Sequence, residues 1–239
     1  LVLYEDYGIA SYDFGSSAQP FELSYLFMQE ALKYQKPKVI GLEVISIFNE
    51  FDANDADPLN YGITDLPFSM EKAVGLADMF RNDKGTGLSY LIPMVQYKDR
   101  WKELTREDFI NPAVNYTKGA YTPDLISGVP LDFSSYYEEE TFTIPERNLE
   151  IFQRMVTLCE ENNIELVLFK SPSVGWNIGQ TKAVASLADQ YGLPFIEYYS
   201  LMGELGIDVA TDFRDNTHLN RYGSKKTSDH MGQYLTKQY

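Results

Sequence analysis

The stretch ELSYLFMQEALKYQKPKVIGLEVISIF, residues 22–48, decides the fold class. In residues 22–35 apolar side chains recur at the spacing of an amphipathic helix. Pro37 breaks that helix, and 36–48 then forms a continuous apolar run, which is typical of a strand buried on both faces. The preceding segment IASYDF (9–14) has the composition of a strand. Together these segments predict a β–α–β unit, and such crossovers imply a parallel sheet.

The same alternation returns in the C-terminal part of the chain. The predicted elements there are a helix over 145–163, a strand over 164–172, a helix over 180–192, a strand over 193–200 and a helix over 222–239. Because helices and strands alternate at both ends of the chain, we expect a three-layer α/β/α sandwich around a parallel sheet.

The middle of the chain, residues 49–144, has a different composition. It is rich in Asp, Asn, Gly, Pro and Tyr, and its patterns predict two short helices, over 69–81 and 97–109. Loops of this length are usually functional covers or disordered segments, and the many aromatic residues favour order. We therefore expect a single domain over 1–239, with 49–144 as an insertion that covers one end of the sheet.

Composition narrows the classes of partner. The 239 residues carry a formal charge of −15, so nucleic acid and anionic membrane surfaces are disfavoured as partners. The single cysteine, Cys159, excludes an internal disulfide, and no Cys/His spacing of a zinc site is present. Cys159 falls on the apolar face of a predicted helix, which favours a buried structural thiol. No apolar run is long enough to span a bilayer, and no signal peptide is visible.

The residues with the clearest chemistry lie in DFRDNTHLNRYGSKK, residues 212–226. Asp215 precedes His218 by three positions, so on a helical turn the two side chains would share a face. A carboxylate beside an imidazole selects the ring tautomer and stabilises the imidazolium when it forms. Ligands of parallel α/β sheets bind on the loops that lead from strands into helices. We therefore predict that His218 is a general base and that Asp215 orients it. The alternative is that the two residues only cap the last helix.

Three runs of sequence carry a resemblance to a known family. DNTHLNRYG (215–223) resembles the last signature block of the SGNH hydrolases, also called GDSL esterases, whose Asp-x-x-His supplies the acid and the base. YDFGSSAQP (12–20) and EALKYQKPKVIGLEV (30–44) are similar in order and spacing to the family's second block and the helix and strand after it. The chain most resembles membrane-anchored SGNH-like proteins of Gram-positive gut bacteria, some with inserts like YKDRWKELTREDF (97–109). Such relatives include esterases and O-acyltransferases that act on surface glycans.

The resemblance implies an SGNH/flavodoxin-like fold, a location at the cell surface and an oxyanion hole built from Gly15, Ser16 and Ser17. In that family the nucleophilic serine follows the first strand, upstream of the second block. We therefore expect the chain to be truncated, beginning after the nucleophile, with the first strand, the nucleophile turn and a membrane anchor removed. The alternative is that Ser16 or Ser17 is the nucleophile. The family's third block carries Gly-x-Asn-Asp, whereas here Asn49 is nearby but out of register.

The resulting hypothesis is an esterase or O-acyltransferase for acyl esters of a small molecule or surface glycan. It needs no metal and no organic cofactor. The candidate substrate contacts are Glu43, Asn49, Arg100 and Trp101. One alternative is a non-catalytic glycan-binding module on the same scaffold. Another is a metal site formed by Asp212, Asp215 and His218.

Overall fold

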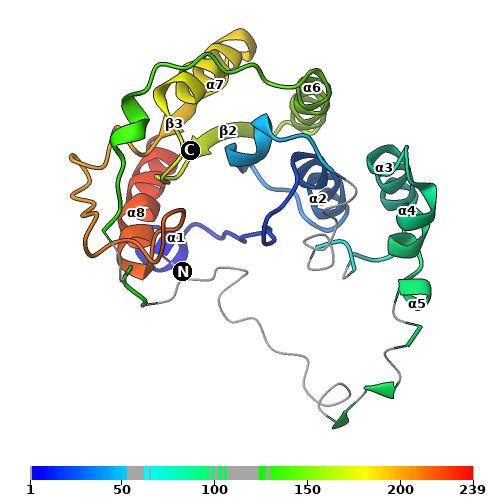
Figure 1. The fold of residues 1–239 in the computed structure, drawn as a ribbon. Coiled ribbons are helices and arrows are strands. Elements are labelled where there is room, and N and C mark those ends of the chain that lie inside the picture. The colour runs from blue at the N-terminus through cyan, green and yellow to red at the C-terminus, as the bar shows by residue number, and fades with distance from the viewer. Residues whose placement is uncertain are drawn as a thin grey trace.

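The computed structural model describes residues 2–52, 62–64, 66–96, 98, 99, 102, 103, 105, 106, 124–127 and 130–238. In these ranges the chain folds around one parallel sheet that is flanked by helices (Figure 1). The three strands of the sheet, in their spatial order, are β1 (Val39–Glu43), β2 (Glu165–Lys170) and β3 (Phe195–Glu197). Both pairs of neighbouring strands are parallel, so the predicted parallel α/β organisation is confirmed.

The first predicted strand is wrong. Residues 9–14 form neither helix nor strand, and residues 10–15 are exposed. Instead of joining the sheet, Phe14 stacks on Phe27 of α2 (Phe21–Tyr34), with the ring centroids 4.4 Å apart. The strand predicted over 36–48 is also shorter in the structure. It ends at Glu43, and the 3₁₀ helix η1 (Ile45–Phe48) follows.

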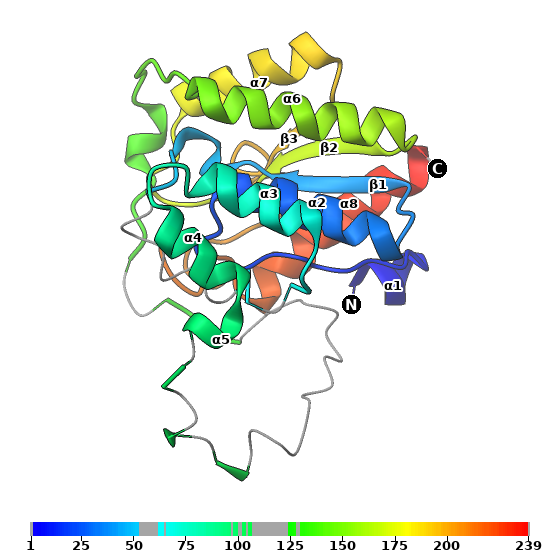
Figure 2. The same ribbon diagram turned by 90° about the vertical axis from the view of Figure 1, so that its right-hand side faces the viewer.

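One face of the sheet packs on three helices. α2, α6 (Glu146–Glu161) and α7 (Ile178–Tyr191) contribute to the largest apolar cluster, which includes Leu42 and Leu168 from the strands. Figure 2 shows α6 and α7 above the strands. α6 buries residues at helical spacing, among them Cys159. The structure therefore confirms the buried thiol that the pattern predicted.

The other face of the sheet packs on α8 (Arg221–Gln238). Met231 and Tyr234 of α8 contact a cluster formed by Val167, Ile196 and Tyr198. α1 (Val2–Tyr7), which the sequence patterns did not predict, lies against α8. β2 is buried on both faces because it is central, whereas β1 is an outer strand among the three that the described residues form, and its Gly41 is exposed.

The middle of the chain adds helices beside α2. α3 (Met70–Met79) agrees with the prediction over 69–81, and α4 (Lys84–Leu91) and α5 (Pro93–Gln96) follow it. α3 and α4 pack on Leu23, Leu26 and Phe27 of α2 in a second apolar cluster. Most of the helix predicted over 97–109 falls outside the described residues.

Residues 127 and 131–133 lie beside the loop that precedes α8. Ser127 N donates to Phe213 O at 2.8 Å, and the ring of Phe133 lies 5.4 Å from that of Phe213. The 3₁₀ helix η6 (Ser134–Tyr137) continues along the carboxyl end of β3, where Tyr136 Oη donates to Glu197 Oε2 at 3.1 Å. Among the described residues, no helix has both the length and the apolar character needed to cross a bilayer.

Candidate functional site

Asp215 and His218 lie on a tight turn between β3 and α8. Phe213 and Leu219 form an antiparallel bridge, and Arg214 N donates to His218 O at 2.9 Å. These bonds close the turn over the four residues 215–218. The pair is therefore not on a helical turn as the three-residue spacing suggested, because α8 begins only at Arg221.

The two side chains nevertheless meet as the sequence predicted. His218 Nδ1 lies 2.8 Å from Asp215 Oδ1 and 3.0 Å from Oδ2. An N–H at Nδ1 that donates to the carboxylate leaves a lone pair on Nε2, on the far side of the ring. The His218 side chain is 59% exposed, so Nε2 can be reached from solvent. In this arrangement Nε2 can accept a proton while the carboxylate holds the ring in place.

The carboxylate of Asp215 is held in its ionised form. Its Oδ1 accepts hydrogen bonds from Thr217 N and His218 N, both at 2.9 Å, and Arg214 Nε donates to its Oδ2 at 2.9 Å. Burial alone would raise the pKa of Asp215. The hydrogen bonds from Thr217, His218 and Arg214 outweigh burial and hold this pKa well below its usual range.

A buried asparagine, Asn220, closes the loop and caps α8. Its Oδ1 accepts from Tyr222 N at 2.9 Å and Gly223 N at 3.2 Å, and its Nδ2 donates to Thr211 O at 2.7 Å. The cap of α8 is therefore Asn220, and Asp215 and His218 do not serve as caps. Sequence reasoning missed this role, because it began the helix at 222 and the structure begins it at Arg221, directly after Asn220, a preferred capping residue.

The turn is tied to the sheet through the loop that follows β2. Val174 N donates to the carbonyl oxygen of Asn216, inside the turn, at 2.7 Å. The same loop begins at Lys170, the last residue of β2, whose side chain is 1% exposed. Lys170 Nζ lies 3.3 Å from Glu43 Oε1 and 3.0 Å from Ser173 Oγ. Sequence reasoning missed Lys170, although a lysine that ends an apolar strand is unusual.

The carboxylate of Glu43, a candidate substrate contact, accepts hydrogen bonds from backbone amides. Its Oε2 accepts from Ile45 N at 2.7 Å, and its Oε1 accepts from Ser171 N at 3.2 Å beside Lys170. The exposed Asn49 lies after η1, and its carbonyl oxygen accepts from the buried Asn148. The other two candidate substrate contacts, Arg100 and Trp101, are outside the described residues.

The GSSAQP turn has hydrogen bonds of its own. The amide and the hydroxyl of Ser16 both donate to Gln19 Oε1, at 2.8 Å and 3.1 Å. Gly15 and Ser17 are exposed. Within the described part of the chain, no hydrogen bond joins Ser16 or Ser17 to Asp215 or His218.

Asp212, one of the three residues of the alternative metal site, makes other contacts. Asp212 is buried, and its Oδ2 pairs with Lys226 Nζ at 2.5 Å and accepts from Asp208 N. Over the described ranges, no three His, Cys, Asp or Glu side chains gather as a metal ion would need. The Asp212 carboxylate thus forms an ion pair with Lys226.

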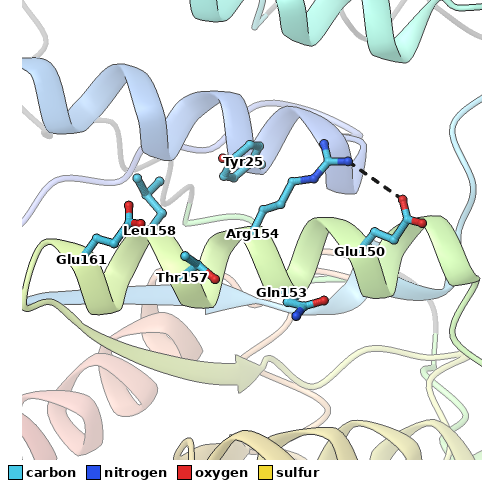
Figure 3. Close-up of a pocket in the computed structure, with 7 residues that line it drawn as sticks. All are labelled: Tyr25, Glu150, Gln153, Arg154, Thr157, Leu158 and Glu161. Atoms are coloured by element: carbon cyan, nitrogen blue, oxygen red, sulfur yellow. Dashed lines mark ion pairs between the residues drawn. The ribbon is translucent and has the colours of Figure 1, made fainter.

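A groove of about 590 Å³ lies elsewhere, between α2 and α6 (Figure 3). Its lining residues are Tyr25, Glu150, Gln153, Arg154, Thr157, Leu158 and Glu161. The lining is helix surface, with Arg154 and Glu150 as an ion pair at 3.9 Å. The groove shares no residue with the turn of Asp215 and His218 or with the carboxyl ends of the strands.

Comparisons with known proteins identified no relative of this chain. A scan against protein-family models, a search of curated proteins and a search of solved structures each found no match. The site is therefore defined by its own geometry, an exposed imidazole oriented by an ionised carboxylate.

Proposed function

We propose that this protein is an SGNH-type serine esterase or O-acyltransferase that acts on acyl esters of carbohydrate at the cell surface. In this proposal His218 is the general base and Asp215 orients it. The contact of 2.8 Å between His218 Nδ1 and Asp215, with the other side of the ring open to solvent, is the observation that carries the proposal. The proposal also takes the sheet and its helices as a three-layer α/β/α sandwich of the SGNH/flavodoxin type.

The proposed nucleophile is a serine on a further strand beside β1, in a segment upstream of Leu1. Glu165 N donates to Lys38 O and Val44 N donates to Phe169 O, so alternate residues of β1 bond to β2. The backbone groups of Val39, Gly41 and Glu43 consequently face the other edge, where the described residues contribute no strand. A parallel strand added there would end at the carboxyl end of the sheet, the side on which the turn of His218 lies.

The proposed chemistry follows the arrangement of atoms. His218 Nε2 takes the proton of the serine hydroxyl as its oxygen attacks the ester carbonyl. Asp215 keeps the N–H on Nδ1 and stabilises the imidazolium. Backbone N–H groups near Gly15–Ser17 hold the oxyanion. For this the amide of Ser16 must release Gln19 Oε1 and donate to the substrate oxygen instead. The imidazolium then protonates the leaving alcohol, and water or a sugar hydroxyl releases the acyl group.

Fluorophosphonate labelling read by intact mass tests the proposal. We expect a label on a chain extended upstream through its natural N-terminus, and loss of that label in the His218→Ala variant. A label on Ser16 or Ser17 of residues 1–239 would instead identify the nucleophile within the GSSAQP turn. Absence of label from both chains would overturn the esterase proposal.

The hydrogen bonds of Ser16 to Gln19 favour a second candidate, a non-catalytic glycan-binding module. Tyr137 and Tyr222 are 70% and 54% exposed, and exposed rings of this kind can stack on sugars. Calorimetric titration of the chain with acylated and deacylated glycans would support this candidate if both bind without turnover. Loss of binding in Tyr222→Ala would locate the surface.

A further inference from the structure

Each strand of the sheet ends in a charged residue. Glu43, Lys170 and Glu197 are the last residues of β1, β2 and β3. Glu197 is bound by its own loop, since Tyr199 N and Ser200 N both donate to its carboxylate at 2.9 Å. Glu43 and Lys170 pair across neighbouring strands. The pair therefore links two strands at the end of the sheet where the turn of His218 lies.

Lys170 uses its ammonium group to hold the backbone of the next loop. Nζ donates to Ser171 O at 2.5 Å and to Ser173 Oγ at 3.0 Å, in addition to its contact with Glu43. The ring of Trp176, at the far end of the same loop, lies 5.0 Å from Nζ. One buried cation thus contacts the beginning, the middle and the end of residues 171–176.

Stability alone is a weak explanation for this cation. Burial lowers the pKa of Lys170, an effect that the Glu43 carboxylate opposes. Replacing a buried ion pair with apolar side chains is often neutral or stabilising, because the desolvation cost disappears. What an apolar residue at this position would lose is the set of directional contacts to Ser171 and Ser173.

The loop held by Lys170 reaches the turn of the candidate site. Val174 directly follows Ser173, and its N–H donates to Asn216 O at 2.7 Å, between Asp215 and His218. We propose that the Lys170–Glu43 pair positions the Asp215–His218 turn by fixing the loop 171–176. This inference rests on the proposed role of His218 as a base, and it assigns Lys170 as a positioning residue that acts through Val174 and Asn216.

Nitrogen NMR of the two histidines tests the inference, with His218 identified in a His230→Gln background. The variants are Lys170→Met, which removes the ammonium group, and Ser173→Ala, a milder change that removes one of its acceptors. Lys72→Met is the matched control, since Lys72 is also 1% exposed and its Nζ also donates to a backbone carbonyl, that of Leu66. The readouts are the ratio of Nδ1–H to Nε2–H tautomers of neutral His218 and the exchange rate of the Val174 amide.

We expect Lys170→Met to lower the tautomer ratio of His218 by about threefold to tenfold, the effect of weakening one hydrogen bond. Exchange at Val174 should accelerate by a similar factor. Ser173→Ala should act in the same direction but less, and Lys170→Arg should restore most of the ratio. Lys72→Met should leave both readouts unchanged. If Lys170→Met and Ser173→Ala accelerate exchange at Val174 without changing the tautomer ratio, Lys170 is structural only and the inference is overturned.

The test separates the inference from the proposed function, because it requires neither a nucleophile nor a substrate. Failure of fluorophosphonate labelling together with the expected tautomer change would refute the esterase and leave the positioning role intact. Suppose instead that labelling is lost in His218→Ala, while Lys170→Met changes neither the labelling nor the tautomer ratio. That result would support the esterase and refute the positioning role of Lys170.

Discussion

Asn220 offers the sharpest test of how the loop of the candidate site is held. The residue is 0% exposed, and its side chain makes three hydrogen bonds, two to the first turn of α8 and one to Thr211 O. In Asn220→Ala all three are lost. Removal of a helix cap costs ~1 kcal/mol, and loss of the Thr211 bond adds about as much again, so the total is about 2 kcal/mol.

The assay is urea unfolding followed by far-ultraviolet circular dichroism, with the free energy of unfolding extrapolated to water. In a chain of this length each kcal/mol corresponds to a fall of about 2–4 °C in Tm, so Asn220→Ala should unfold roughly 4–8 °C below the wild type. Asn220→Ser retains a capping oxygen but cannot reach Thr211 O, and it should lose only ~1 kcal/mol.

Asn162→Ala is the matched control. Asn162 is exposed, and its side chain makes one hydrogen bond, to Leu158 O at 2.8 Å at the end of α6. This variant should stay within about 0.5 kcal/mol of the wild type. If Asn220→Ala is as stable as Asn162→Ala, or if Asn220→Ser loses as much as Asn220→Ala, the assigned roles of the three bonds are wrong.

Three other properties can be measured on the same chain. Because the pKa of Asp215 is lower in the folded state than its unfolded value of ~3.9, its contribution to stability is present at neutral pH and is lost as the pH falls into the acid range. The stability difference between wild type and Asp215→Asn should therefore shrink on acidification, and a constant difference in urea titrations would contradict the assignment. Gly179→Ala should cost roughly 1–3 kcal/mol, since a Cβ there would overlap the carbonyl oxygen of Glu140. Gly203→Ala, which meets nothing, is its control, and equal Tm values for the two would refute the steric argument. Burial raises the pKa of Cys159 to about 11, so the native chain should resist a thiol reagent that reacts fully in urea, and rapid native reaction would show that the thiol is accessible.

The parallel α/β organisation could be predicted because burial repeats along the chain with the period of each element. In α6 the buried residues follow the helical spacing that the sequence displays, and Gly192, with a positive φ of 64°, ends α7 at the predicted limit of that helix. The contact between Asp215 and His218 could also be predicted, because three residues separate them. The type of turn could not be predicted, since a separation of three residues brings two side chains together both in a helix and in a tight turn.

Other features depend on segments that are distant in the chain. Residues 9–14 have a strand-like composition, but they form no strand and Phe14 stacks on α2, because a strand needs a partner that composition cannot supply. The pairing of Lys170 with Glu43 requires β1 and β2 to lie side by side with one register.

The sequence by itself determined the helices α2, α6, α7 and α8 and the three strands of the parallel sheet, and it placed an acid beside a base. Only the tertiary structure decided that β2 lies between β1 and β3, that Asn220 caps α8 and that Val174 holds the turn at Asn216. The physical reason is that hydrophobic periodicity records whether a side chain is buried. The partner of a buried polar group is set by how the layers meet.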